Sequence, residues 1–224
     1  TIVCFGANAA DQHHSPSETR TLKAGECVLI DMGCIWNGYC SDMTRTFYCK
    51  SVDEEQAAIH DLVRTAVEKA EAIIKPGVRF CDIDAQARDL IGEAGYGEYW
   101  KIRLGHFIGQ EDHEYGDVSP INKNVAEPGM IFSIEPGIYI EGSHGVRLEN
   151  ELLVCEGEKN EYGEFLYFEP ITYVPFDLDA INPDIMNAED KERLNTYHAT
   201  VYEKVSPYLN DEEKEWLKKY TRAI

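Results

Sequence analysis

Carboxylates that interrupt apolar, strand-like segments constrain this chain more than any other feature of its sequence. Asp31 lies in VLIDMG, within an apolar run bounded by Gly25 and Gly33 that predicts a buried strand. Glu135 lies in IFSIEPG, a second apolar run that ends at a Pro-Gly pair. Burying a carboxylate in such a strand is costly unless the group is paired or bound to a metal. The fold must therefore bring these side chains to a partner or a cation.

Three further residues extend this pattern: Asp42 in YCSDMTRTF, His106 in RLGHFIG and Glu149 in VRLENEL. Taken singly, each is more often a turn, surface or hydrogen-bonded structural residue. Together, four carboxylates and one imidazole form an oxygen-rich set that suits Mn²⁺ or a similar divalent ion. Carboxylates that bridge can hold two ions about 3.5–4 Å apart, as in two-metal hydrolases. The neighbouring Arg147 is expected to neutralise surplus carboxylate charge.

The charge balance excludes some classes of partner. A formal charge of −20, from 41 acidic and 21 basic residues, argues against nucleic acid and against an anionic membrane surface. Seven cysteines without a CxxC pair argue against a zinc ribbon and favour a reducing, cytoplasmic compartment. The sequence shows no signal peptide and no long apolar stretch. Thr1 at the start favours a fragment over an autoprocessed threonine nucleophile, which no other residue supports.

The apolar pattern changes period along the chain. Residues 1–50 predict strands, including a pair at Ile35–Tyr39 and Met43–Cys49 joined by a turn near Ser41. Helical spacing from Ile59 to Ile74 stops at a Pro-Gly pair, and a second helix is expected over Ile83–Ala94. Strands return over residues 100–155 and near 165–174. Two final helices are expected after caps formed by these pairs: Asn187 with Asp190, and Asn210 with Glu213.

The metal-ligand motifs, taken in order, resemble those of the pita-bread metallopeptidases, which include aminopeptidase P, prolidase and methionine aminopeptidase. The family's ligands follow the order Asp, Asp, His, Glu, Glu, which corresponds here to Asp31, Asp42, His106, Glu135 and Glu149. The resemblance implies an α+β fold in which helices cover a curved antiparallel sheet, with a helical tail. It also implies two divalent metal ions, with Mn expected and Co, Zn or Fe as alternatives.

The resemblance also implies catalytic roles. HHSP is similar to the family's H-x-x-P loop and aligns His13 with a substrate-side histidine, with His14 as the alternative. His113, in EDHE, aligns with a second active-site histidine. These histidines would stabilise the oxyanion. Glu135 would carry a proton from the nucleophilic water to the leaving nitrogen, and also serve as a ligand.

The ligand roles follow the same family pattern. Asp31 would chelate one ion, and His106 and Glu135 would bind the other. Asp42 and Glu149 would bridge the two ions.

The C-terminal segments FEPITYVPFD and EEKEWLKKYT resemble aminopeptidase P. The expected function is therefore an Xaa-Pro aminopeptidase acting on peptides, with a homodimer as a further expectation. Residues 1–174 are expected to form the catalytic domain, and residues 175–224 a C-terminal helical extension packed on it. A prolidase is the alternative within the enzymes. A non-catalytic peptide- or protein-binding module is the alternative outside them, although such modules normally lose ligands.

Two departures from the family pattern stand out. Phe107 stands where the family usually has glycine, which predicts an altered pocket wall beside His106. The pita-bread fold has two similar halves, and the helices of residues 53–95 belong to the second. The helices of the first half and the N-terminal domain of aminopeptidase P are expected before Thr1. The chain is thus expected to be the N-terminally truncated, metal-bearing portion of a longer protein.

Overall fold

Antiparallel strands and two long helices build residues 1–172, and residues 173–224 form a second, helical unit. The computed structural model describes residues 1–15, 17–73 and 75–224. Pro16 of the HHSP motif and Ile74 of the first expected helix therefore lie outside the described residues. The mixture of helices with antiparallel sheets confirms the expected α+β class.

A three-stranded sheet, in the order β1-β2-β5, carries the first two acidic motifs. Asp31 in β2 lies opposite Thr44 in β5. The first strands along the chain are β1 (Ile2–Phe5), β2 (Cys27–Met32), β3 (Ile35–Trp36), β4 (Tyr39–Cys40) and β5 (Met43–Tyr48). The apolar run around Asp31 thus forms a central strand with a partner on each side.

A second sheet, in the order β12-β11-β8-β6-β7, carries the remaining motifs, and β9 pairs with β10. All of its neighbouring strands are antiparallel. The bounds are β6 (Gly105–Phe107), β7 (Glu114–Val118), β8 (Ile131–Ile134), β9 (Gly137–Ile140), β10 (His144–Arg147), β11 (Asn150–Asn160) and β12 (Gly163–Pro170). Pro136 separates β8 from β9 because proline has no N–H to donate to a strand ladder.

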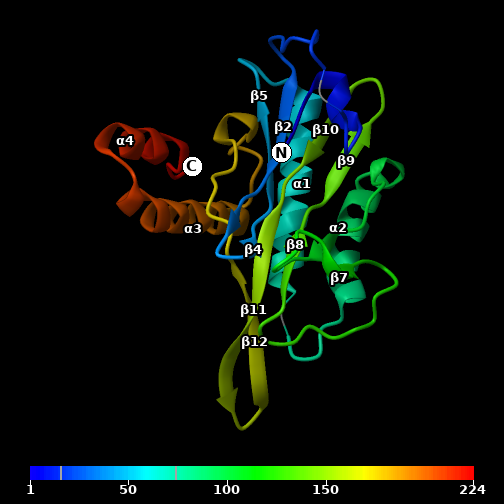
Figure 1. Cartoon of the computed structure of the whole chain (residues 1–224), viewed down its shortest axis with the longest axis vertical. Helices are drawn as coiled ribbons and strands as arrows, with labels where there is room; N and C mark the ends of the chain where they lie inside the picture. Colours follow the sequence, from blue (N-terminus) through cyan, green and yellow to red (C-terminus); the bar gives the residue numbers. More distant parts are fainter. Residues whose placement is uncertain (16, 74) are drawn as a thin grey trace. The chain divides into compact units, whose positions relative to one another are not determined.

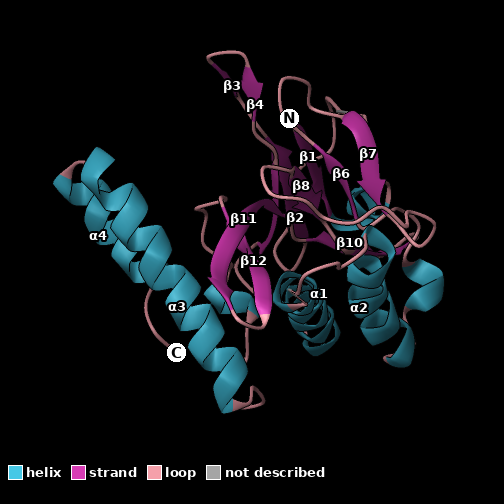
Figure 2. Cartoon of the chain, turned by 90° about the horizontal axis from the view of Figure 1, so that it is seen from below, coloured by secondary structure: helices cyan, strands magenta, loops and turns pink. Residues whose placement is uncertain are grey.

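Helices α1 (Glu54–Ala72) and α2 (Phe80–Glu93) lie side by side on one face of the strands of the first unit (Figures 1 and 2). Asp53 caps α1 by accepting a hydrogen bond of 2.8 Å from the main-chain N–H of Gln56. The helices and strands share a buried apolar core that includes these residues: Ile59, Val63, Val67, Phe80, Ile83, Ile91, Phe132, Ile134, Val146 and Leu152. Helices and sheet thus bury one another's apolar faces.

Two local expectations were wrong. The hairpin after β2 turns at Asn37-Gly38, not near Ser41, and joins the short strands β3 and β4. Asn37 and Gly38 have φ angles of 50° and 84°, the left-handed values that a tight two-residue hairpin needs. Helix α2 begins at Phe80, three residues before the expected start. A cap formed by Arg79 and Asp82 provides this earlier start.

The second unit contains α3 (Ala188–Val205) and α4 (Asp211–Tyr220). The expected caps are confirmed, because Asn187 accepts from the N–H of Asp190 and Asn210 accepts from the N–H of Glu213. The helix face around Tyr197 also binds the segment before α3, since the Tyr197 hydroxyl donates to the Val174 carbonyl at 2.9 Å. Within the described part of the chain, no helix is long and apolar enough to span a membrane.

Candidate metal centre

Asp31 and Asp42 meet at one end of the three-stranded sheet. Asp31 lies near the end of β2, and Asp42 directly precedes β5, its antiparallel partner. The end of one antiparallel strand lies beside the start of the next, so the two carboxylates come together, and each affects the pKa of the other. The chain leaves this sheet after β2, forms the β3–β4 hairpin and returns to the sheet at Asp42. Asp31 and Asp42, eleven residues apart, are therefore brought together by the pairing of β2 with β5 and not by a tight turn between them.

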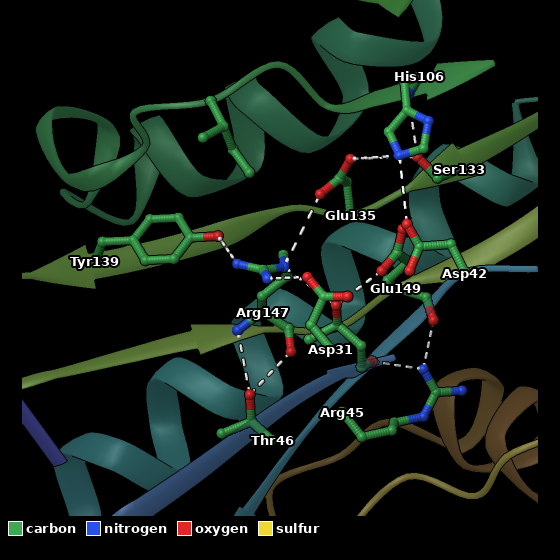
Figure 3. Close-up of polar contacts among 12 residues, drawn as sticks. Asp31, Asp42, Arg45, Thr46, His106, Ser133, Glu135, Tyr139, Arg147 and Glu149 are labelled. Atoms are coloured by element: carbon green, nitrogen blue, oxygen red, sulfur yellow. Dashed lines mark hydrogen bonds and ion pairs between the residues drawn. The ribbon is translucent and has the colours of Figure 1, made fainter. Parts of the chain in front are cut away.

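His106 and Glu135 come from the second sheet and face the first. His106 Nε2 lies 3.6 Å from Asp42 Oδ2 and 3.5 Å from Glu135 Oε1 (Figure 3). Gly105 allows this approach, because a Cβ there would lie only 1.8 Å from the main-chain oxygen of Ser133. The Ser133 hydroxyl accepts from the His106 N–H at 3.0 Å and lies 3.3 Å from Glu135 Oε1. The serine thus connects the backbone of one candidate ligand to the side chain of another.

Glu149 lies between β10 and β11 and is 1 % exposed. Its Oε2 accepts a hydrogen bond of 2.7 Å from the Thr44 hydroxyl, whereas its Oε1 is buried without a hydrogen-bond partner among the described residues. Ligand atoms of Asp42, His106 and Glu149 all lie within 4.8 Å of one another. A buried carboxylate oxygen without a hydrogen-bond partner among the described residues, beside a carboxylate and an imidazole, fits a hard divalent cation.

Arg147 is the guanidinium of this cluster and is 2 % exposed. Its Nη2 donates to Asp31 Oδ2 at 2.5 Å, and its Nη1 donates to the Tyr139 hydroxyl at 2.9 Å (Figure 3). Its Nε donates to the Thr44 hydroxyl at 3.1 Å and lies 3.9 Å from Glu135 Oε2. Arg147 therefore fixes Asp31 and places one positive charge among the carboxylates.

Burial and mutual repulsion shift the pKa values of the two glutamates. Burial raises the pKa of Glu149 well above its ordinary value, and the charges of Glu135 and Asp42 add to the rise. Burial likewise raises the pKa of Glu135 to about 7, against the lowering effect of Arg147 and His106. The cluster holds more negative charge than its own cations balance, and a divalent ion would relieve that repulsion.

The aspartate and the imidazole shift in the directions expected of partners. Burial works to raise the pKa of Asp42, but hydrogen bonds with His106 and Asp31 hold it below its ordinary value. Burial works to lower the pKa of His106, yet Asp42 and the charge of Glu135 raise it overall. The Asp42 carboxylate and the His106 imidazole thus favour each other's charged forms.

Both histidines that were expected on the substrate side face one cavity. His113 stacks on His106 with ring centroids 3.8 Å apart, and its pKa is lowered by burial and by the charge of His106. His14 instead contacts Asp11, with Nδ1 3.3 Å from Oδ2. The cavity has a volume of about 380 Å³ and is lined by Thr1, Ile2, His13, Asp31, Met32, Gly33, Cys34, Ile35, Cys40, Ser41, Asp42, Asp112 and His113. It opens directly onto the two aspartates of the cluster.

Four polar residues of the centre escaped the sequence reasoning: Thr44, Ser133, Tyr139 and Glu151. Thr44 and Glu151 each follow a candidate ligand by two residues, the spacing that puts side chains on one face of a strand. That period was a usable signal for both. Glu151 is 6 % exposed, and burial raises its pKa to about 7. Its carboxylate accepts a hydrogen bond of 2.7 Å from the main-chain N–H of Asp42.

Phe107 does not line the cavity described above. Its ring packs edge-on against Phe80, with centroids 4.9 Å apart, and lies close to Phe132. The ring also covers Gly116, where an added Cβ would lie 2.3 Å from it. The side chain thus fills the core beside α2.

Comparison with protein families gives two matches. The model of metallopeptidase family M24 matches residues 1–156, and the model of the C-terminal region of this family matches residues 164–224. An uncharacterized peptidase from Staphylococcus saprophyticus is 50 % identical over 156 residues, which cover 70 % of this chain and 44 % of that protein. One from Staphylococcus aureus strain MRSA252 is 49 % identical over 154 residues, 69 % of this chain and 44 % of that protein. The aligned part of the chain thus spans less than half the length of these relatives.

Solved structures agree with the family models. X-prolyl aminopeptidase from Caenorhabditis elegans, described as a cytosolic enzyme with a di-nuclear active site, is 25 % identical with a TM-score of 0.89, covering 100 % of this chain and 38 % of its own. X-Pro aminopeptidase from Thermotoga maritima is 34 % identical with a TM-score of 0.71, covering 80 % and 47 %. Prolidase from Pyrococcus furiosus is 36 % identical with a TM-score of 0.67, covering 75 % and 47 %. The expected pita-bread fold with C-terminal helices is confirmed, and the chain belongs to metallopeptidase family M24.

Proposed function

We propose that the complete protein is a dinuclear metal-dependent Xaa-Pro aminopeptidase, which removes the first residue from peptides with proline in second position. The observation that carries this proposal is the meeting of Asp42, His106 and Glu149 around a buried carboxylate oxygen that lacks a partner among the described residues. The likeness to the C. elegans X-prolyl aminopeptidase covers the whole chain, including the C-terminal unit. That coverage favours an aminopeptidase over a dipeptidase.

The proposed ligand roles follow from which groups face one another. Asp31 would hold one ion and His106 with Glu135 the other, and Asp42 and Glu149 would bridge them. Two divalent ions, with Mn as the proposed metal, would lower the pKa of a water molecule enough to make it a nucleophile near neutral pH. Support comes from the oxygen-rich donor set, which suits Mn better than a thiolate-preferring metal. Residues 1–174 would form the catalytic domain, with residues 175–224 as its extension.

The remaining residues would bind substrate and move protons. His113 and His13 face the cavity, where they would donate hydrogen bonds to the carbonyl oxygen as negative charge develops on it. Glu135, which lies 3.5 Å from His106 Nε2 at the centre, would accept a proton and deliver it to the leaving nitrogen. An Xaa-Pro bond is a tertiary amide, so its nitrogen has no N–H and must receive this proton to leave. Arg147 would hold Asp31 in place throughout.

A prolidase, which cleaves Xaa-Pro dipeptides, is the second candidate. It draws support from the 36 % identity with prolidase from P. furiosus, which is higher than the identity with the C. elegans aminopeptidase. The cytosolic location described for the C. elegans enzyme is proposed for this protein as well. A pita-bread module without catalysis is less favoured because the chain retains a complete ligand set.

The test uses the complete protein loaded with Mn²⁺ and compares Met-Pro-Gly with Met-Pro. We expect cleavage of the Met-Pro bond in the tripeptide at a higher kcat/KM than in the dipeptide. Asp42→Ala should lower kcat/KM by more than about 100-fold, beyond the effect usual for groups behind the ligands, and lower the Mn content. Asp117→Ala is the control, since Asp117 contacts Arg103 and Ser119 outside the cluster.

Each result decides between the candidates. A preference for the dipeptide would establish the prolidase alternative. Bound Mn²⁺ with cleavage of neither peptide would overturn the proposed specificity, and no bound Mn²⁺ at saturation would favour a binding module. Full activity of the Asp42→Ala variant would overturn the two-metal assignment.

A further inference from the structure

Glu151 is a buried carboxylate next to the metal centre that the proposed mechanism does not use. It lies in β11, two residues after Glu149, and is 6 % exposed. Its Oε1 accepts a hydrogen bond of 2.7 Å from the main-chain N–H of Asp42, which is 109 residues away in sequence. We infer that Glu151 is a positioning residue, which holds the backbone of Asp42 so that its carboxylate can serve both metal ions. This inference rests on the proposed function.

The contact lies where the two sheets join. Asp42 precedes β5, and Glu149 precedes β11, so each strand begins at the centre. The Glu149 N–H donates to the Thr44 carbonyl at 3.0 Å, which is a strand-like bond between these segments. Asp42 lies two residues before Thr44, and Glu151 lies two residues after Glu149. Here the Asp42 N–H donates to the side chain of Glu151 instead of to a main-chain carbonyl. The carboxylate thus continues the connection between the sheets at the very residue that carries the candidate bridging ligand.

The main chain of Glu151 is itself held by hydrogen bonds at both its N–H and its carbonyl. Its N–H donates to the Thr172 hydroxyl at 2.8 Å, and its carbonyl accepts from the Ile171 N–H at 2.9 Å. These bonds fix the backbone from which the side chain extends. The carboxylate therefore reaches the Asp42 N–H because the glutamate side chain is long enough. The strand has little freedom to shift so that a shorter side chain could make the same contact. Such preorganisation is what a metal ligand needs from the groups behind it.

Glu151 can act on the centre in two ways, as a hydrogen-bond acceptor for Asp42 or as a source of negative charge, and two substitutions distinguish them. If Glu151 positions Asp42, the requirement is an oxygen at the right distance, and a neutral amide of the same length can supply it. If Glu151 instead acts by adding negative charge to the centre, a shorter carboxylate will serve better than an amide. Glu151→Gln keeps the length and removes the charge. Glu151→Asp keeps the charge and withdraws the oxygen by one methylene.

The experiment measures Mn²⁺ affinity and stoichiometry of the complete protein from the EPR signal of free Mn²⁺. Thermal melts of the metal-free variants check that each is folded. We expect Glu151→Asp to weaken Mn²⁺ binding about 10- to 100-fold, the range usual for groups that orient metal ligands, and Glu151→Gln to keep most of the affinity. Glu169→Gln, on β12, is the matched control and should bind as wild type, since its carboxylate contacts Cys155.

The outcomes distinguish this inference from the proposed function. Tighter binding by the Asp variant than by the Gln variant would overturn the positioning role while leaving a metallopeptidase intact. Equal, wild-type affinity in both variants would also overturn it. A wild-type protein that binds no Mn²⁺ would refute the proposed function itself, and the inference with it. Parallel loss in the Glu169→Gln control would mean that any glutamate in this sheet matters, again against a specific role.

Discussion

Two buried ionic clusters in the first unit are built on opposite plans. On α1, Arg64 is fully buried and binds Asp61, with Nη2 2.7 Å from Oδ1, as well as Glu68. Its partners lie three residues before it and four residues after it, so two consecutive turns of one helix supply the whole cluster. The metal centre draws its four candidate carboxylate ligands from positions 31 to 149, and they lie with the guanidinium of Arg147 and the imidazole of His106. The first cluster is assembled locally, and the second depends on the whole unit.

The difference indicates what each cluster is for. Arg64 lies directly between its two carboxylates, and its pKa is raised by their charges although burial opposes the rise. In the metal centre, burial raises the pKa of both glutamates, and neighbouring carboxylates add to the rise. A cluster in which one guanidinium lies between two neighbouring carboxylates contributes to structure. A cluster in which several carboxylates repel one another is suited to receive a cation.

The largest expected effect on stability comes from removing Arg64, the central residue of the cluster on α1. Arg64→Met should lower the free energy of unfolding of the metal-free protein by about 3–5 kcal/mol, because it leaves the buried Glu68 and the partly buried Asp61 without their partner. Chemical denaturation measures this loss. Arg193→Met is the matched control, because Arg193 pairs with Glu189 at the same four-residue spacing on an exposed face of α3. The control should lose less than about 1 kcal/mol, and equal losses would contradict the contrast between buried and exposed pairs.

Metal addition tests the other cluster. Free Mn²⁺ at 100 times its dissociation constant should stabilise the wild-type protein by about 2.7 kcal/mol, because the ion binds the folded state. Glu149→Gln should lose most of this increment. Arg64→Met should retain it, although its starting stability is lower. If the Arg64 variant also lost the increment, the two clusters would be coupled and their separation would fail.

The pH dependence of stability gives a further test of the comparison between the two clusters. His60 on α1, next to the Arg64 cluster, is buried in its neutral form. Burial, together with the charge of Arg64, lowers its pKa to about 3. The unfolded state takes up a proton near pH 6.5 while the folded state does not, so stability is full above pH 6.5 and falls as the pH falls toward 3. The slope is about 1.4 kcal/mol per pH unit.

His60→Gln should remove this share of the acid dependence, and unfolding measured between pH 6 and pH 4 gives the difference in slope. The comparison should be made without added metal, so that ligand protonation in the centre is common to both proteins. An unchanged slope in the variant would show that His60 is protonated in the folded state or that other groups dominate the acid limb.

Sequence reasoning found the candidate ligands because charges stand out in apolar strands. Asp31 and Glu135 are conspicuous for that reason, and the order of the motifs led to the family. Thr44 and Glu151 were missed because they look like ordinary alternating strand residues. Their role depends on the contact between the starts of β5 and β11, which joins segments more than 100 residues apart, whereas the two-residue spacing shows only that each shares a face with a candidate ligand.

The errors in the fold have local causes. Asn37-Gly38 is a strong turn signal, but the polar residues near Ser41 were read as the turn instead, which misplaced the hairpin. The start of α2 was placed late because its cap uses Arg79, a side chain outside the usual capping residues. Helix existence and strand identity were thus easier to predict than their ends, where single side chains decide.

The contact between the two sheets also determines when, during synthesis of the chain, the candidate ligands can come together. Asp42 leaves the ribosome long before Glu149, which follows 107 residues later. At a translation rate of about 5–20 residues per second, the first aspartates wait roughly 5–20 s for their glutamate neighbours. During that interval the candidate ligand set is incomplete, so at the proposed site metal binding would follow the meeting of the two sheets.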